Sequence, residues 1–132
     1  MIQENFLKDM IVLYVADQQR SCSFYKAVLG KEPLLNVPGM TEFELNEKTI
    51  LGLMTESGIQ KILGDKTPSP SSGNGIPRCE LYIAVTDVTN AYDNLLSNGG
   101  KSISPPGMRD WSHFAAYGVD PDWHIIAFAQ II

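Results

Sequence analysis

The side chain with the clearest chemical potential in this sequence is the carboxylate of Glu80, which begins the strand-like run ELYIAV. A carboxylate placed against apolar surroundings should have a raised pKa or a cationic partner, because it loses water. Glu80 is therefore our candidate for a general base, or for a contact with a ligand amine. The alternative, equally open, is a solvated carboxylate or one paired with Arg78 or Arg109.

The other nucleophilic side chains favour structural interpretations. Cys22 falls within a helical pattern and Cys79 at the start of a strand pattern, so we interpret both as small core residues of a reduced, cytoplasmic protein. The serines at positions 69, 71 and 72 lie in a turn-rich stretch without the Gly-x-Ser-x-Gly elbow of serine hydrolases. These serines are therefore not predicted to act as nucleophiles.

Size and charge exclude several classes of partner. A chain of 132 residues fits one domain, here 1–132. The formal net charge of −5 disfavours nucleic acid, because phosphate backbones are bound by clustered Lys and Arg. The start MIQENFLKD lacks a signal-peptide pattern, and no apolar run approaches the roughly 18 residues of a membrane span. We expect a cytoplasmic protein that binds a small molecule and neither nucleic acid nor a membrane.

The sequence pattern of the elements that position these side chains occurs twice in the chain. Residues 10–31 and 80–101 align without a gap, so that Asp17 matches Asp87. Each segment is an apolar strand, then Asp, then a helix whose apolar positions recur every three or four residues. The two Asp residues are expected to cap the helices, and Gly30 with Gly99 or Gly100 to end them. The buried stripes are predicted to comprise Ser21, Tyr25, Val28 and Leu29, and Val88, Ala91, Tyr92, Leu95 and Leu96.

Short strand-like runs separated by turn residues follow each helix. They cover about 33–37, 41–46 and 49–54 in the first half, and about 101–105, 112–118 and 124–130 in the second. The pattern predicts an α+β fold of two tandem βαβββ modules, at about 8–57 and 78–132. The intervening linker, about 58–77, contains ESGIQKILGD, which could form a short helix, and the turn-rich TPSPSSGNGIP.

At this point the sequence resembles the vicinal oxygen chelate superfamily of glyoxalases, bleomycin-resistance proteins and extradiol dioxygenases. Four segments carry the resemblance, in matching order and spacing: VLYVADQQRSCSFYKAVLG, TEFELNEKTILGLM, VTDVTNAYDNLLSNGG and RDWSHFAAYGVDPDWHIIAFA. The resemblance implies two modules whose curved sheet surrounds a cleft, commonly within a homodimer.

The resemblance also implies where a metal would bind, because ligands in such proteins come from the first and last strands of each module. These positions map to Met10, Gly52, Glu80 and Ala127, of which only Glu80 offers a hard donor. His113 and His124 are possible substitutes, but His124 stands an odd number of residues from the mapped position in its strand. We therefore expect no metal and no other cofactor.

Strand alternation predicts which side chains face the cleft. The aliphatic positions of the two first strands, such as Leu13 and Leu81, are expected in the core. The opposite face then lines a mostly apolar site, predicted to include Met10, Val12, Tyr14, Ile50, Gly52, Met54, Glu80, Tyr82, Ile125, Ala127 and Ala129. We interpret Tyr14 and Tyr82 as equivalent positions that offer a pair of hydroxyls, although a structural use is equally open.

Trp111 and Trp123 lie in the two loops that flank the seventh strand. Either indole could stack on a planar ligand at the rim of the cleft. Relatives usually carry Gly where Trp123 stands, so this departure suggests a function. A dimer interface or a covered sheet edge is an equally good account.

Two functions are compatible with these residues. The first is a metal-free binding protein of the bleomycin-resistance kind, which sequesters an apolar or aromatic ligand. The second is an enzyme of the glyoxalase or dioxygenase type, a lyase, isomerase or oxidoreductase that uses Glu80 with atypical or no metal ligation.

Overall fold

The computed structural model describes residue 5 and residues 7–131, which form two compact units. The first comprises the chain up to Cys22 together with Lys31–Gly73, and the second comprises Ser23–Gly30 together with the chain from Asn74 onward. Residues 1–4, 6 and 132 lie outside the described part. The expectations for the start MIQENFLKD and for the last residue of module two therefore fall partly outside it.

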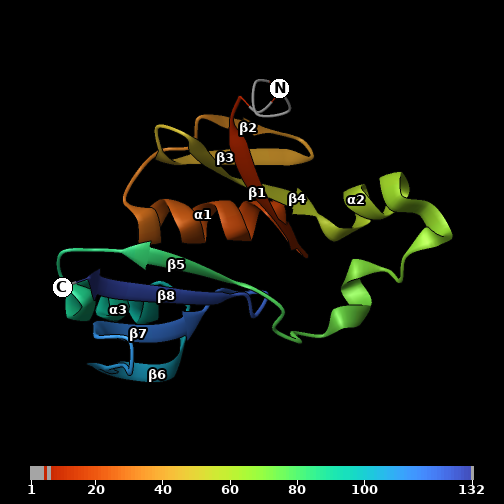
Figure 1. Ribbon diagram of the computed structural model, residues 1–132. Helices are drawn as coiled ribbons and strands as arrows, with labels where there is room; N and C mark the ends of the chain where they lie inside the picture. Colours follow the sequence, from red (N-terminus) through yellow and green to blue (C-terminus); the bar gives the residue numbers. More distant parts are fainter. Residues whose placement is uncertain (1–4, 6, 132) are drawn as a thin grey trace. The chain divides into compact units, whose positions relative to one another are not determined.

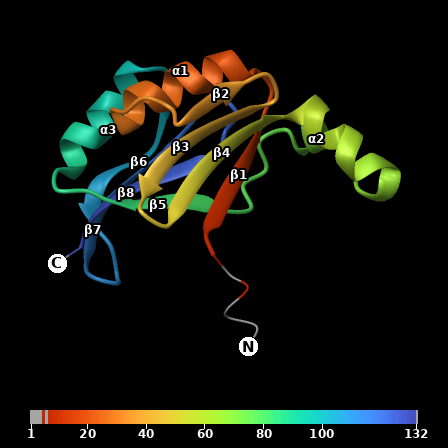
Figure 2. The same ribbon diagram turned by 90° about the horizontal axis from the view of Figure 1, so that it is seen from above.

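The first unit contains a four-stranded mixed sheet in the order β1-β4-β3-β2, which Figure 2 shows side by side. β1 (Asp9–Val15) runs parallel to β4 (Thr49–Thr55), and the neighbours β3 (Met40–Asn46) and β2 (Leu35–Val37) are antiparallel. α1 (Gln18–Leu29) follows β1, and its residues from Ser23 onward belong to the second unit. α2 (Glu56–Leu63) and two short 3₁₀ turns, Gly64–Lys66 and Pro70–Gly73, follow β4.

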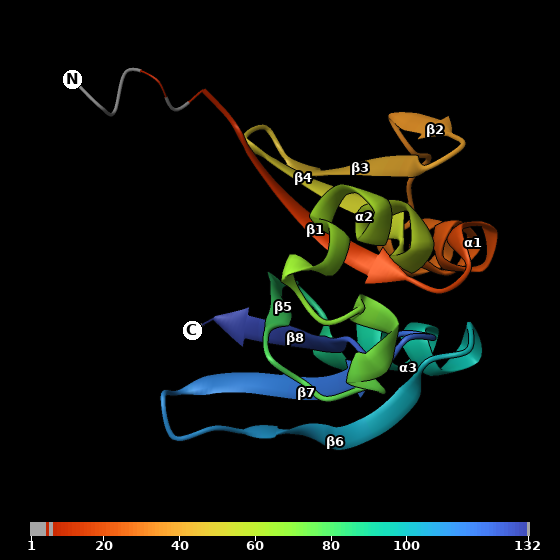
Figure 3. The ribbon, with the colours of Figure 1, turned by 90° about the vertical axis from the view of Figure 1, so that its right-hand side faces the viewer.

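The second unit repeats this sheet in the order β5-β8-β7-β6, visible from top to bottom in Figure 3. β5 (Glu80–Ala84) runs parallel to β8 (Ile125–Ile131), which pairs antiparallel with β7 (His113–Val119), and β7 pairs with β6 (Lys101–Met108). α3 (Val88–Ser97) lies behind this sheet in Figure 1. Its Val88 and Tyr92 pack with Ala116 of β7 into one apolar cluster.

The ends of the helices follow the predicted chemistry. Oδ1 of Asp17 accepts a hydrogen bond from the backbone N–H of Arg20 at 3.0 Å, and Oδ1 of Asp87 accepts one from Asn90 at 3.0 Å. Gly30 and Gly99 adopt φ angles of 68° and 99°, which residues with a Cβ rarely reach. The capping and stop signals in the sequence are thereby confirmed.

The predicted apolar stripes are confirmed at their centres but not at their edges. Ser21 and Tyr25 of α1 are fully buried, as are Val88 and Leu95 of α3. Leu96, predicted to be inside, is 36 % exposed. Cys22 is buried as expected, but Cys79 is exposed because it precedes the first paired residue of β5.

The prediction of an α+β fold with two βαβββ modules is confirmed. One strand is longer than expected, since β6 continues through Pro105 and Pro106 to Met108. The register between β6 and β7 shifts on both sides of Ser104, and β6 is an edge strand. Edge strands with bulges tolerate proline because the missing N–H leaves no ladder bond broken. No helix in the described part of the chain is long and apolar enough to cross a membrane.

Candidate functional site

Three residues line up across one face of the second sheet and define what we call the tyrosine row. Tyr82 of β5 lies opposite Ala127 of β8, which in turn lies opposite Tyr117 of β7. Ala127 is fully buried, whereas Tyr82 is 37 % exposed. The row therefore places a small side chain between two aromatic ones, with part of at least one ring open to solvent.

Tyr82 is also the centre of a hydrogen-bonded group, here called the Tyr82 network. The indole Nε1 of Trp111 donates to the hydroxyl of Tyr82 at 2.9 Å, and this hydroxyl lies 2.8 Å from Nδ1 of His113. The His113 ring centroid is 5.8 Å from that of Tyr82 and 6.4 Å from that of Trp111. The structure thus brings together two predicted site residues, Tyr82 and Trp111, with a histidine that we expected only as a possible metal ligand.

The turn between β6 and β7 positions the Trp111 indole. Ser112 adopts a φ angle of 68°, and its N–H donates to the carbonyl of Arg109 at 3.0 Å. The N–H of Arg109 donates to the carbonyl of His113 at 2.9 Å, which closes the turn. A residue with a positive φ angle between two such bonds reverses the direction of the chain. Trp111 therefore lies beside the sheet that β6 and β7 form.

Charged groups flank the tyrosine row. Burial and the negative charge of Glu80 raise the pKa of Tyr117, while the guanidinium of Arg109 acts in the opposite direction. Nη2 of Arg109 donates to the carbonyls of Pro105 at 3.0 Å and of Ala115 at 2.7 Å, and its Cζ lies 5.1 Å from the Tyr117 ring centroid. Its buried Nε has no partner in the described residues. Within the same part of the chain, Glu80 is exposed and forms none of the predicted ion pairs.

In the first unit, the predicted site residues of β1 and β4 lie beside one another. Met10, Val12 and Tyr14 pair with Ile50, Gly52 and Met54 respectively. A Cβ built on Gly52 would lie 3.1 Å from both Met10 Sδ and Val12 Cγ2. A donor side chain at position 52 would therefore have to displace its neighbours. The binding role of these residues and the cleft itself stay predictions.

The interpretation of Tyr14 and Tyr82 as equivalent is wrong. Val12 is the residue of β1 that pairs with Gly52, whereas Tyr82 is the residue of β5 that pairs with Ala127. Tyr14 lies two positions further along its strand, opposite Met54. In the gapless alignment of the two modules Tyr14 matches Ala84, so the tyrosine row belongs to the second unit only.

Trp123 lies in the loop between β7 and β8 and has a φ angle of 67°. A Cβ built on Gly75 would lie 3.1 Å from the Cβ of Trp123, so the linker passes closely over this residue. Nζ of Lys101 lies 5.2 Å from the indole centroid. A φ angle in this range favours glycine, and the contacts show that Trp123 packs against the linker.

The same loop contains a cluster that the sequence reasoning missed. Asp120, Asp122 and His124 place potential ligand atoms within 4.8 Å of one another. The spacing D-x-D-x-H could have signalled it, but we considered His124 only together with Glu80. Asp120 is buried, with a side chain that accepts four hydrogen bonds. The donors are Tyr25 Oη (2.7 Å), His124 Nδ1 (2.8 Å), His124 N (2.8 Å) and Asp122 N (2.9 Å).

These bonds test whether the cluster suits a metal ion. All lone pairs of a carboxylate are used by four donors, so an ion could reach Asp120 only by displacing Tyr25 or His124. Burial raises the pKa of Asp120. The hydrogen bonds and charge of His124 and the hydrogen bond from Tyr25 lower this pKa by more than burial raises it, so the net shift is downward. Burial and the charge of Asp120 raise the pKa of Tyr25. The arrangement makes Asp120 a structural anchor of the loop.

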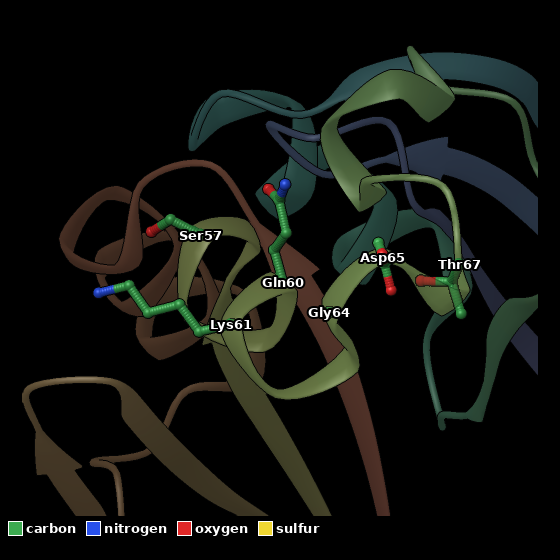
Figure 4. Close-up of a pocket in the computed structure, with 6 residues that line it drawn as sticks. All are labelled: Ser57, Gln60, Lys61, Gly64, Asp65 and Thr67. Atoms are coloured by element: carbon green, nitrogen blue, oxygen red, sulfur yellow. The ribbon is translucent and has the colours of Figure 1, made fainter.

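An open hollow of about 640 Å³ lies beside α2, lined by Ser57, Gln60, Lys61, Gly64, Asp65 and Thr67. Figure 4 shows Lys61 extending away from Asp65 and Thr67, so the polar groups do not converge on one point. None of the predicted site residues lines it. We assign no function to this hollow.

The two sheets, their repeated connectivity and the matching sequence segments define one class of protein. Residues 8–128 match the model of the glyoxalase/bleomycin resistance protein/dioxygenase superfamily, and the chain belongs to this family. No curated protein matches the chain.

Solved structures agree with this assignment at the level of the fold. A glyoxalase-related enzyme from Fulvimarina pelagi is similar with a TM-score of 0.81 and 23% identity, covering 93% of this chain and 86% of that one. A glyoxalase/bleomycin resistance protein/dioxygenase family enzyme from Burkholderia phytofirmans PsJN has a TM-score of 0.80 at 14% identity, with 93% and 97% covered. A superfamily member from Sphaerobacter thermophilus DSM 20745 has a TM-score of 0.70 at 21% identity, with 94% and 96% covered.

Proposed function

We propose that this protein binds a small aromatic molecule on the tyrosine row of the second unit, as a binding protein rather than a metal-dependent enzyme. The observation that carries the proposal is the alignment of Tyr82, Ala127 and Tyr117 across three adjacent strands. This face of the sheet has a small apolar side chain between two aromatic ones and few polar groups, which is the usual composition of small-molecule sites.

The spacing of the row suits a planar ligand. Adjacent strands lie about 4.8 Å apart, so the Cα atoms of Tyr82 and Tyr117 are separated by roughly 10 Å. Aromatic rings interact favourably at centroid distances of about 4.5–7 Å. One ring seated above Ala127 would therefore be in range of both tyrosines. Because Ala127 is fully buried, the ligand would have to displace the side chains that now cover it.

The chemistry of the row supports binding more than catalysis. The raised pKa of Tyr117 makes this phenol a poorer acid and keeps it neutral at physiological pH. The remaining polar groups, Tyr82, Trp111 and His113, are engaged with one another. Such a group is suited to orient a ligand.

Fluorescence and thermal stability test the proposal together. The chain has two tryptophans, so the Trp123→Phe variant leaves Trp111 as its only indole reporter. We expect 2-naphthoate to quench Trp111 and to raise the melting temperature by mass action. Tyr82→Ala should weaken binding about tenfold, since aromatic stacking contributes about 0.5–1.5 kcal/mol beyond area burial.

Two controls separate this function from its alternatives. Tyr92→Phe changes a tyrosine of the same unit that packs with Val88 and Ala116 beneath the sheet, and it should leave the affinity unchanged. Elemental analysis and melting curves with Zn²⁺, Ni²⁺, Mn²⁺ and Fe²⁺ test the enzyme alternative. Stoichiometric tight metal, or equal losses of affinity in both tyrosine variants, would contradict the proposal.

A further inference from the structure

We propose that His113 gives the site a preference for aromatic ligands that carry a hydrogen-bond acceptor, such as a carbonyl or carboxylate oxygen. The inference rests on the proposed function and names the class of ligand that the site selects. It follows from counting the hydrogen atoms of the Tyr82 network.

The indole N–H of Trp111 can only donate, so at 2.9 Å it occupies a lone pair of the Tyr82 oxygen. The hydroxyl of Tyr82 has a single hydrogen to give, and Nδ1 of His113 lies 2.8 Å away. An imidazole nitrogen accepts a phenol hydrogen readily, because the phenol is the better donor of the two. The chain of bonds thus runs from Trp111 through Tyr82 to His113.

This direction fixes the tautomer of the histidine. If Nδ1 accepts, the hydrogen of a neutral imidazole must be on Nε2. No hydrogen bond to Nε2 is found in the described residues, and this atom is absent from the buried unpartnered atoms there, which include only Arg109 Nε. His113 therefore presents an N–H donor that is ready for a ligand and is held in place by Tyr82.

The surroundings favour an acceptor over a donor. His113, Ala115 and Tyr117 alternate along β7 and so lie on the same face of the sheet. Arg109 bonds to the carbonyl of Ala115 and stacks on Tyr117. Its positive charge adds attraction for an oxygen with negative charge. Glu80, two residues before Tyr82, is the only acidic residue of β5. It lies at one end of this strand, and the row of paired residues that includes Ala115 crosses the sheet at the other end.

The first experiment reads the tautomer without any ligand. The chain has two histidines, so a His124→Gln variant assigns the ring signals of a ¹⁵N-histidine-labelled protein. We expect His113 to show a protonated Nε2 and an unprotonated, hydrogen-bonded Nδ1. Tyr82→Phe should remove the hydrogen-bond signature at Nδ1. A protonated Nδ1 in the wild type would overturn the inference.

The second experiment compares three probes with the same ring system: 2-naphthoate, 2-acetylnaphthalene and 2-ethylnaphthalene. The two acceptor-bearing probes should bind about tenfold more tightly than the ethyl compound, the size expected for one net hydrogen bond. His113→Phe keeps an aromatic ring and should abolish this preference, so that the three probes bind this variant with the same affinity. Equal binding of all three probes by the wild type would overturn the inference and leave the proposed function standing. Failure of all three to bind would refute the proposed function itself.

Discussion

The number of hydrogen bonds to the buried carboxylate of Asp120 predicts how much a substitution there lowers the free energy of unfolding. Replacing it with Asn preserves the shape but leaves one oxygen where two oxygens accept four hydrogen bonds. The amide NH₂ would then face two donors that lose their acceptor. Hydrogen bonds to charged groups contribute about 1.5–3 kcal/mol each. We therefore expect Asp120→Asn to lower the free energy of unfolding by about 3–6 kcal/mol.

Urea unfolding followed by circular dichroism measures this loss directly. With roughly 4 °C of melting temperature per kcal/mol, the value at which the ranges for shorter and longer domains meet, the variant should melt about 12–24 °C lower. Tyr25→Phe removes only one of the four bonds and should cost about 1.5–3 kcal/mol.

The matched control is Tyr92→Phe, since the Tyr92 hydroxyl bonds to Ser102, a neutral partner in the same unit. This variant should cost only about 0.5–1.5 kcal/mol. An Asp120→Asn protein within 1 kcal/mol of the wild type, or one no less stable than Tyr92→Phe, would refute the assignment of Asp120 as the anchor of the β7–β8 loop.

Three further predictions address charge and packing. Because the pKa of Asp120 is lowered in the folded protein, its contribution to stability should be complete above about pH 4 and lost as the pH falls through the folded value; acid titration of Asp120→Asn should lack this component. Gly52→His should melt lower than the wild type and gain no metal in elemental analysis, because its Cβ would contact two methionine sulfurs and a valine methyl within 3.4 Å. Gly100→Ala should cost about 1–3 kcal/mol in urea unfolding, since its Cβ would lie 2.2 Å from Leu95 Cδ2. Gly73→Ala, with nothing within 4 Å, should unfold like the wild type.

The fold could be predicted because its signals are local and repeated. Asp17 and Asp87 cap helices, Gly30 and Gly99 end them, and the two halves supply independent copies of the same pattern. Strand alternation likewise predicted the buried Leu81 between Glu80 and Tyr82. Such signals depend on neighbours in sequence, so they need no knowledge of tertiary contacts.

The site could be predicted only in part, because its contacts join distant segments. Tyr82, Trp111 and Ala127 were proposed from strand parity and loop position, but the bond from Trp111 to Tyr82 spans 29 residues. His113 joins them through a turn whose positive φ at Ser112 has no glycine to signal it.

Trp123 shows that the place of a side chain in a loop does not predict which residues it contacts. Its place in a loop suggested ligand stacking, a dimer interface or a covered sheet edge. The structure shows Gly75 and Lys101 beside it, contacts that the sequence did not reveal, and ligand stacking stays a prediction.

Nuclear Overhauser effects between a bound aromatic probe and the methyl group of Ala127 provide the most direct test. This methyl lies between Tyr82 and Tyr117 on the sheet. We predict that 2-naphthoate gives contacts to the Ala127 methyl and to both tyrosine rings, and that its carboxylate lies near His113. Contacts confined to the hollow beside α2, or saturable binding without any contact to Ala127, would contradict the account.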